Sequence, residues 1–167
     1  MTSILIGNII SLVGCTLMVC IGFIKEKKRI LTAQCFQFGI LSISNLVLGG
    51  TMGFVSNIVS IIRNLVFSRW KSTTPLKLLF IAVQLLLSLR ASEGGLVGWL
   101  PVLATILFTW FIDTKSEVTL KTVIIVSEVF WLVYDLCHLN YVSVCFDAFT
   151  MLSNFAGILM LRRPRKK

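Results

Sequence analysis

Polar and small side chains recur at helical spacing through an otherwise apolar stretch near the C-terminus, residues 143–157. They are Ser143, Asp147, Thr150, Asn154 and Gly157. Spacings of four and three residues place all of them on one face of a helix. A carboxylate at membrane depth costs about 2.5–3.5 kcal/mol unless it is paired, protonated or facing water. We therefore predict that Asp147 faces a polar path between helices.

Two other segments carry similar stripes. The first holds Gly53, Asn57, Ser60 and Asn64, and the second holds Glu128, Trp131 and Asp135. We predict that a small polar solute is bound by Asn57, Asp147, Asn45, Trp131, Asp135, Asn64 and Asn154. The alternative for the amides and hydroxyls is purely structural, because such groups also hydrogen-bond neighbouring membrane helices.

Glu128 and Asp147 are the candidates for proton coupling, because burial in a low dielectric favours the neutral form of a carboxyl group. Arg63 lies within another apolar segment and has two open interpretations. It pairs with an acid, Glu128 being nearer in depth than Asp147, or it extends to the cytoplasmic surface.

The composition predicts what surrounds these residues. The 167 residues are 56% hydrophobic and only 14% charged, which is too apolar for a soluble domain. A membrane-spanning helix needs about 20 apolar residues. Charged and glycine-rich breaks divide the chain into seven predicted spans, residues 4–24, 31–48, 52–67, 75–89, 96–112, 119–137 and 141–161.

The distribution of basic residues predicts how the chain is oriented. With seven spans, 14 of the 16 Lys and Arg residues fall on one side of the membrane, while Arg90 falls on the other side and Arg63 lies inside a span. Basic residues are retained in the cytoplasm, so we expect an external N-terminus and a cytoplasmic C-terminus. The net charge of +9 is dispersed over separate loops, which argues against nucleic-acid binding.

An internal repeat appears when residues 6–72 are laid on residues 96–162 without a gap. Rare polar residues then coincide, as Asn45 with Asp135, Asn57 with Asp147, Ser60 with Thr150 and Asn64 with Asn154. We predict two three-helix repeats, residues 1–71 and 95–167, joined by a linker helix within residues 72–94. Because the linker is a single helix, the two repeats have the same orientation in the membrane.

This plan resembles the SWEET and PQ-loop transporter superfamily. The pattern WLVYD at residues 131–135, Asp147, Asn57 and Pro101 stand where that superfamily has its W-x-x-Y pattern, substrate-facing asparagine and helix proline. The resemblance implies an all-α protein of seven transmembrane helices arranged as 3+1+3 parallel repeats.

In length and detail the chain resembles the YgjV-type family of bacterial inner membrane proteins. The features are Gln34 or Gln37 ahead of LVLGG, N-x-x-S-x-x-R-N at residues 57–64, LPVLATILFTW at residues 100–110, and the spacing from Trp131 to Asp147. This resemblance implies a fold and a location in the inner membrane, without a substrate.

Enzyme chemistry is not expected. The single histidine, His138, has no matching serine or cysteine motif, and the five cysteines lack metal-ligand spacing. Cys137 and Cys145 flank one hairpin, and a disulfide between these two residues is a minor alternative. We expect no cofactor, metal or catalytic residue.

The function predicted from sequence is transport of a small polar solute, with a sugar as one candidate, by alternating access between the two repeats. The alternative is a membrane scaffold or sensor of the same fold that transports nothing. The partners expected are the lipid bilayer and the solute, and assembly into a homo-oligomer stays open.

Overall fold

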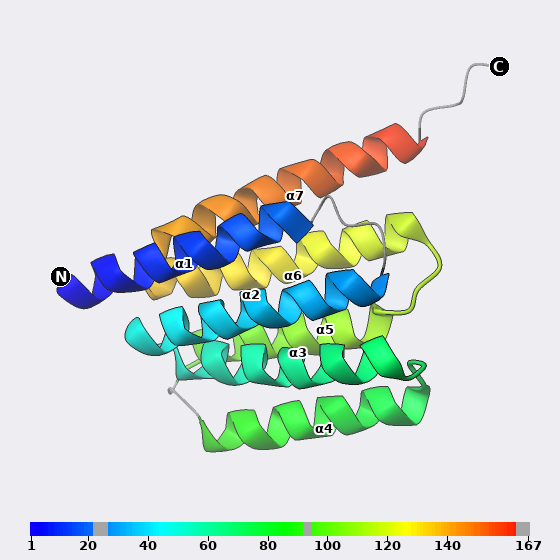
Figure 1. Cartoon of the computed structure of the whole chain (residues 1–167), viewed down its shortest axis with the longest axis horizontal. Coiled ribbons are helices and arrows are strands. Elements are labelled where there is room, and N and C mark those ends of the chain that lie inside the picture. The colour runs from blue at the N-terminus through cyan, green and yellow to red at the C-terminus, as the bar shows by residue number, and fades with distance from the viewer. Residues whose placement is uncertain (22–26, 92–94, 163–167) are drawn as a thin grey trace.

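The computed structural model describes residues 1–21, 27–91 and 95–162 and is all-helical (Figure 1). Its helices are α1 (Thr2–Ile21), α2 (Lys27–Val47), α3 (Thr51–Arg69), α4 (Thr74–Arg90), α5 (Leu100–Phe111), α6 (Glu117–Cys137) and α7 (Tyr141–Arg162), with a 3₁₀ turn, η1 (Val97–Trp99), before α5. The predicted all-α class and the seven helices are confirmed. Parts of the expected breaks at 25–29 and 91–95 lie outside the described residues, as do the end of the first predicted span, residues 22–24, and the basic tail at 163–167.

Three of these helices are long and apolar enough to cross a membrane, judged by length and composition. They contain the spans Thr2–Val19, Thr51–Arg69 and Tyr141–Leu161. Two shorter apolar stretches, Leu31–Val47 and Val97–Phe111, accompany them.

Two predicted boundaries were wrong. Helix α2 begins at Lys27, four residues before the apolar run, and so includes basic residues that we expected in a loop. Lys and Arg are good helix formers, so a helix can extend beyond its apolar residues. The fifth segment was predicted as one helix from residue 96, but η1 precedes α5 and Pro101 lies in the first turn of α5. Proline is tolerated there because the first-turn N–H has no helical partner.

Local sequence signals explain several helix ends. The side chain of Ser116 caps α6 by accepting a hydrogen bond from the backbone N–H of Thr119, at 3.2 Å. Pro75 opens α4 as expected. The turns after α2 and α6 each use a residue with positive φ, Gly49 at 84° and Leu139 at 57°. Such left-handed residues commonly end helices.

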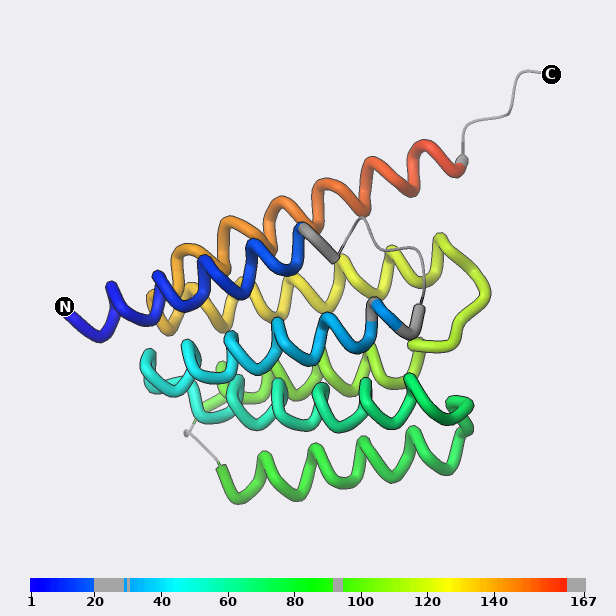
Figure 2. The backbone as a smooth tube through the Cα atoms, viewed as in Figure 1, coloured from blue at the N-terminus to red at the C-terminus, as the bar shows by residue number. Residues whose placement is uncertain are grey.

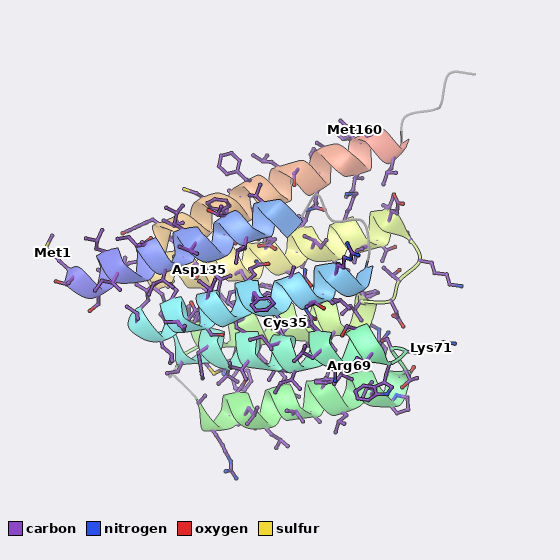
Figure 3. All side chains as sticks on the ribbon, in the orientation of Figure 1. Met1, Cys35, Arg69, Lys71, Asp135 and Met160 are labelled. Carbon is purple, nitrogen blue, oxygen red and sulfur yellow. The ribbon has the colours of Figure 1, made fainter. Side chains whose placement is uncertain are left out.

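The helices pack in a closed ring of six. Going round it, α1 contacts α2, α2 contacts α3, α3 contacts α5, α5 contacts α6, α6 contacts α7, and α7 returns to α1. Helix α4 packs against α3 and α5. Figure 2 shows that consecutive helices run back and forth, so α1, α3, α5 and α7 share one direction. Figure 3 shows Met1 at one end of the bundle and Lys71 at the other.

Burial in this ring is the reverse of that in a soluble protein. Among the described residues, twenty buried side chains are polar or charged and eleven are hydrophobic, while many large aliphatic and aromatic side chains lie on the outside. Phe149 and Met160 of α7, for example, are 68% and 71% exposed. This arrangement suits a protein whose surroundings are hydrocarbon and whose polar groups bond to one another.

Tyr134 holds the two halves of the ring together. Its side chain is fully buried on α6, and its hydroxyl accepts a hydrogen bond from the backbone N–H of Gly53 in α3, at 2.9 Å. The first-turn N–H groups of a helix have no partner within it, so this bond satisfies one of them. A Cβ atom on Gly53 would lie 2.7 Å from the Tyr134 ring and 2.8 Å from Asn45 Nδ2.

This contact generates a stability prediction. We expect Gly53→Ala to lower the free energy of unfolding by about 1–3 kcal/mol, because a rigid ring leaves no room for the methyl group. Gly39→Ala is the matched control, since a Cβ on Gly39 in α2 would meet nothing within 4 Å. Helix propensity should make that variant more stable by about 0.5–1 kcal/mol. Thermal unfolding of the purified protein in detergent measures both, and equal stability of the two variants would contradict the tight contact.

Candidate functional site

Two neighbouring cavities lie inside the helix ring. The first, which we call the hairpin cavity, has a volume of about 70 Å³ and is lined partly by Asn45, Asn57, Asp135, Asn140 and Asp147. The second, the arginine cavity, has a volume of about 270 Å³ and is lined partly by Arg63, Ser60, Thr105, Thr150 and Asn154. Both are lined by Met18, Gln37, Phe38, Glu128 and Trp131. These shared residues form the boundary between the cavities.

Most residues predicted to bind the solute line these cavities. Asn45, Asn57, Trp131, Asp135 and Asp147 line the hairpin cavity. Asn154 and Trp131 line the arginine cavity. Asn64 lines neither cavity; it is fully buried and hydrogen-bonds Arg63, so its place in the predicted binding set needs correction to a supporting position.

Asn57 lies on α3 and Asp147 on α7, and both side chains are buried against the hairpin cavity. The polar stripes on these helices therefore face the cavities, as the spacing of their residues predicted. Each stripe faces the ring interior because its other faces carry large apolar side chains that suit lipid.

The hairpin cavity concentrates acidic groups. Asp135 and Asp147 are 5% and 8% exposed, and Glu128 is half-buried between the two cavities. Asp135 Oδ1 accepts a hydrogen bond from Asn140 Nδ2 at 3.2 Å, whereas Asp147 Oδ2 is buried without a hydrogen-bond partner among the described residues. Glu128 and Asp147 both line this cavity.

None of the residues lining the hairpin cavity is basic. Carboxyl groups that are close together in a low dielectric repel one another when charged, and a basic partner would offset that repulsion. The cavity therefore gathers carboxyl groups without a basic partner among its described lining residues.

Sequence reasoning missed Asn140 and Tyr134. Asn140 is 1% exposed, donates to Asp135 and accepts from the backbone N–H of Ser143, at 3.4 Å. It therefore fixes an acid to the turn between α6 and α7. The signal for Tyr134 was present in the closely spaced Gly50 and Gly53, because both glycines leave room for its side chain.

Neither sequence interpretation of Arg63 holds. The guanidinium is 1% exposed, so it does not extend to the surface, and no salt bridge joins it to an acid within the described part of the chain. It donates instead to Asn64 Oδ1 and to Thr109 Oγ1, and lies 5.1 Å from the centre of the Phe108 ring. Asn64 is the next residue along α3, whereas Thr109 is available because α5 packs against α3, which sequence periodicity could not show.

The described residues contain no group of three or more His, Cys, Asp or Glu side chains placed to hold a metal ion. Cys137 and Cys145 are free thiols in the structure, as are Cys15 and Cys35.

Replacing Asp147 by Asn tests the acidic cavity through its stability. The groups that face Asp147 are Glu128 and Asp135 on α6 and Cys15 on α1, none of which is basic. The buried carboxyl group has no basic partner among the described residues that line the cavity, so replacing it should raise the free energy of unfolding at pH 8 by about 1–2 kcal/mol.

The matched control is Asp113→Asn, because Asp113 forms a salt bridge with Lys77 that the change removes. This variant should be less stable than the natural protein. Unfolding temperatures in detergent at pH 8 provide the measurement. If Asp147→Asn lost stability at pH 8 as Asp113→Asn does, the unpaired buried acid would be refuted.

Comparison with known proteins assigns the family. No curated protein and no solved structure matches the chain significantly. A family model described as Imp-YgjV, a bacterial inner membrane protein, matches residues 5–165. That match covers nearly the whole chain and agrees with the apolar helices of the bundle. The chain therefore belongs to the Imp-YgjV family of bacterial inner membrane proteins.

Proposed function

We propose that this protein is a seven-span membrane transporter that moves a small polar solute by alternating access between two three-helix units. The units are residues 1–71 and 95–167, and α4 links them. The observation that carries the proposal is the cavity system, whose walls are built from equivalent residues of the two units.

Helix boundaries support the repeat. An offset of 90 residues carries the start and end of α2 onto those of α6, Lys27 to Glu117 and Val47 to Cys137. It also carries the start of α3, Thr51, onto the start of α7.

The turns repeat as well. The positive-φ residues Gly49 and Leu139 are 90 positions apart. In the first turn Gly50 donates its backbone N–H to the Asn45 carbonyl at 2.7 Å, and in the second Asn140 donates to the Asp135 carbonyl at 2.9 Å. Equivalent residues therefore make the same turn in the two units.

Ring packing follows the same rule. Exchanging α1, α2 and α3 for α5, α6 and α7 leaves the set of ring contacts unchanged, because the α3–α5 contact becomes the α7–α1 contact. Corresponding helices share a direction, which is the parallel arrangement of two units about an axis along the membrane normal.

The cavity walls consist largely of equivalent pairs. The pairs in which both members line a cavity are Cys15 and Thr105, Met18 and Phe108, Gln34 and Ile124, Gln37 and Ser127, Phe38 and Glu128, Leu41 and Trp131, Asn45 and Asp135, Asn57 and Asp147, and Ser60 and Thr150. A cavity lined in this way lies between the units. Transporters of repeated architecture bind their solutes at such an interface and change access by rocking one unit against the other.

A scaffold or sensor would not need this interior. Polar walls around an empty volume cost stability in a membrane protein, since the same helices could be joined by close apolar packing. Hydroxyl, amide and carboxyl groups here suit a solute with several hydrogen-bonding groups, a sugar being one class. We extend the proposal to the SWEET-like 3+1+3 plan and to proton coupling through Glu128 and Asp147.

Transport is tested with purified protein in proteoliposomes. We expect uptake of at least one member of a panel of labelled sugars, monocarboxylates and neutral amino acids, stimulated by a pH gradient. Glu128→Gln and Asp147→Asn should lose accumulation driven by the gradient at least ten-fold while exchange persists. Glu117→Gln is the control, because Glu117 is exposed in the first turn of the same helix α6.

Two outcomes would count against the proposal. Absence of flux for the whole panel with folded protein would favour the scaffold or sensor. Unchanged pH dependence in folded Glu128→Gln and Asp147→Asn would remove the proton coupling and leave transport in place.

The proposed topology has its own test. Arg69 and Lys71 lie at the bundle end opposite Met1, as expected for a cytoplasmic end rich in basic residues (Figure 3). A C-terminal green fluorescent protein should therefore fluoresce in cells, and a C-terminal alkaline phosphatase should be inactive. The opposite pair of signals would reverse the topology.

A further inference from the structure

Arg63 is the one basic side chain among the residues that line the two cavities, and its hydrogen-bonding capacity is incompletely used. A guanidinium has five N–H groups. Nε and Nη2 donate to Asn64 Oδ1 at 3.2 and 3.1 Å, and Nη1 donates to Thr109 Oγ1 at 3.0 Å. One N–H on each terminal nitrogen is left over.

The contacts of Arg63 fix its orientation. Asn64 is itself anchored because its Nδ2 donates to Gln34 Oε1 at 3.0 Å. Thr109 donates its own hydroxyl proton to the Thr105 carbonyl at 2.6 Å, so its oxygen is free to accept from Arg63. The guanidinium carbon of Arg63 lies over the Phe108 ring, 5.1 Å from the centre of the ring. The cation is therefore held ready by groups on α2, α3 and α5.

Arg63 has no acidic group in direct contact among the described residues. Burial of a guanidinium among neutral partners is unfavourable, and a counter-ion with good hydrogen-bond geometry offsets the cost. Glu128 lines the same cavity, but no ion pair joins it to Arg63 among the described residues. An anionic ligand would supply both the charge and the acceptors for the unused N–H groups.

The position of Arg63 is also where the repeat breaks. Its equivalent in the second unit is Ser153, which is exposed and donates its hydroxyl to the Thr150 carbonyl. The neighbouring pair, Asn64 and Asn154, keeps its residue type. A positive charge placed in one unit alone is not needed to build the repeated fold, which favours a role in recognition.

We propose that the arginine cavity binds the carboxylate group of a small monoanionic solute and that Arg63 is the residue that recognises it. The inference rests on the proposed transport function and names its substrate class. A single guanidinium balances one negative charge, and Glu128 in the same wall disfavours a phosphate dianion. Hydroxyls of Ser60, Thr105 and Thr150 suit further polar groups of the solute, and the volume of about 270 Å³ accommodates a small molecule.

The test measures binding directly, as the rise in unfolding temperature of the purified protein with ligand concentration. Two carboxylates are each paired with an uncharged counterpart, lactate with lactamide and gluconate with glucose, and inorganic phosphate is a separate arm. We expect at least one carboxylate to stabilise the natural protein at concentrations at least ten-fold lower than its counterpart. This comparison needs no variant to fold.

Variants then locate the site. Arg63→Gln should weaken carboxylate binding about 10-fold to 100-fold, as expected for charge-assisted hydrogen bonds. Arg63→Lys keeps the positive charge but lacks the planar pair of N–H donors. Its affinity for carboxylate should therefore lie between those of the natural protein and Arg63→Gln. Arg69→Gln, which removes an exposed charge from the same helix, should bind as the natural protein does.

Several results would overturn the proposal. They are equal stabilisation by carboxylates and their uncharged counterparts, stabilisation by phosphate alone, or carboxylate binding that survives in folded Arg63→Gln. Flux of glucose without preference for gluconate would support the proposed transport function and refute the recognition of a carboxylate. Carboxylate binding without flux in proteoliposomes would keep the site and remove the transporter.

Discussion

Polar groups at membrane depth must find their partners within the protein, because the surrounding hydrocarbon offers none. The whole bundle is arranged around this constraint. Tyr134 satisfies a first-turn N–H of α3, Asn140 holds Asp135, and Asn64 and Thr109 hold Arg63. The bonds of Tyr134 and Thr109 connect helices that are distant in sequence and help to determine how those helices pack. Those of Asn140 and Asn64 are local and fix single side chains in place. Among the described residues, Asp147 Oδ2 is an exception, as are Ser72 Oγ and Gln84 Oε1, because none of these buried atoms has a hydrogen-bond partner.

The unpartnered carboxylate oxygen of Asp147 has a functional meaning in the proposed transporter. Proteins retain unsatisfied or strained groups where function requires them, at a cost in stability. Acidic groups gather in the hairpin cavity and the lone arginine lines the other, with Glu128 and Trp131 at the boundary. A solute passing between the two cavities would meet a proton-binding region and a cation in turn. Arg63 and Glu128 both line the arginine cavity, but no ion pair joins them among the described residues.

Much of this organisation could be predicted from sequence. Helix number followed from apolar length, and the inward faces of α3 and α7 followed from spacing, since Asn57 and Asp147 both line the hairpin cavity. Matching polar residues at an offset of 90 indicated which helices correspond. The neighbours of Arg63 could not be predicted, because they depend on how α5 meets α3. Periodicity gives the face of one helix, whereas the role of Asn64 depends on contacts between several.

In the proposed transporter, the polar interior is a path for solute rather than a sealed polar core. Reaction of introduced thiols with a charged, membrane-impermeant reagent tests it most directly, using a version of the chain without its native cysteines. Asn57→Cys and Asn154→Cys, one in each cavity, should react when the reagent is added to one face or the other, and a transported solute should slow the reaction. Phe149→Cys on the lipid-facing side of α7 should stay unreactive. Failure of both cavity thiols to react from either face of the membrane, in folded protein, would contradict the account.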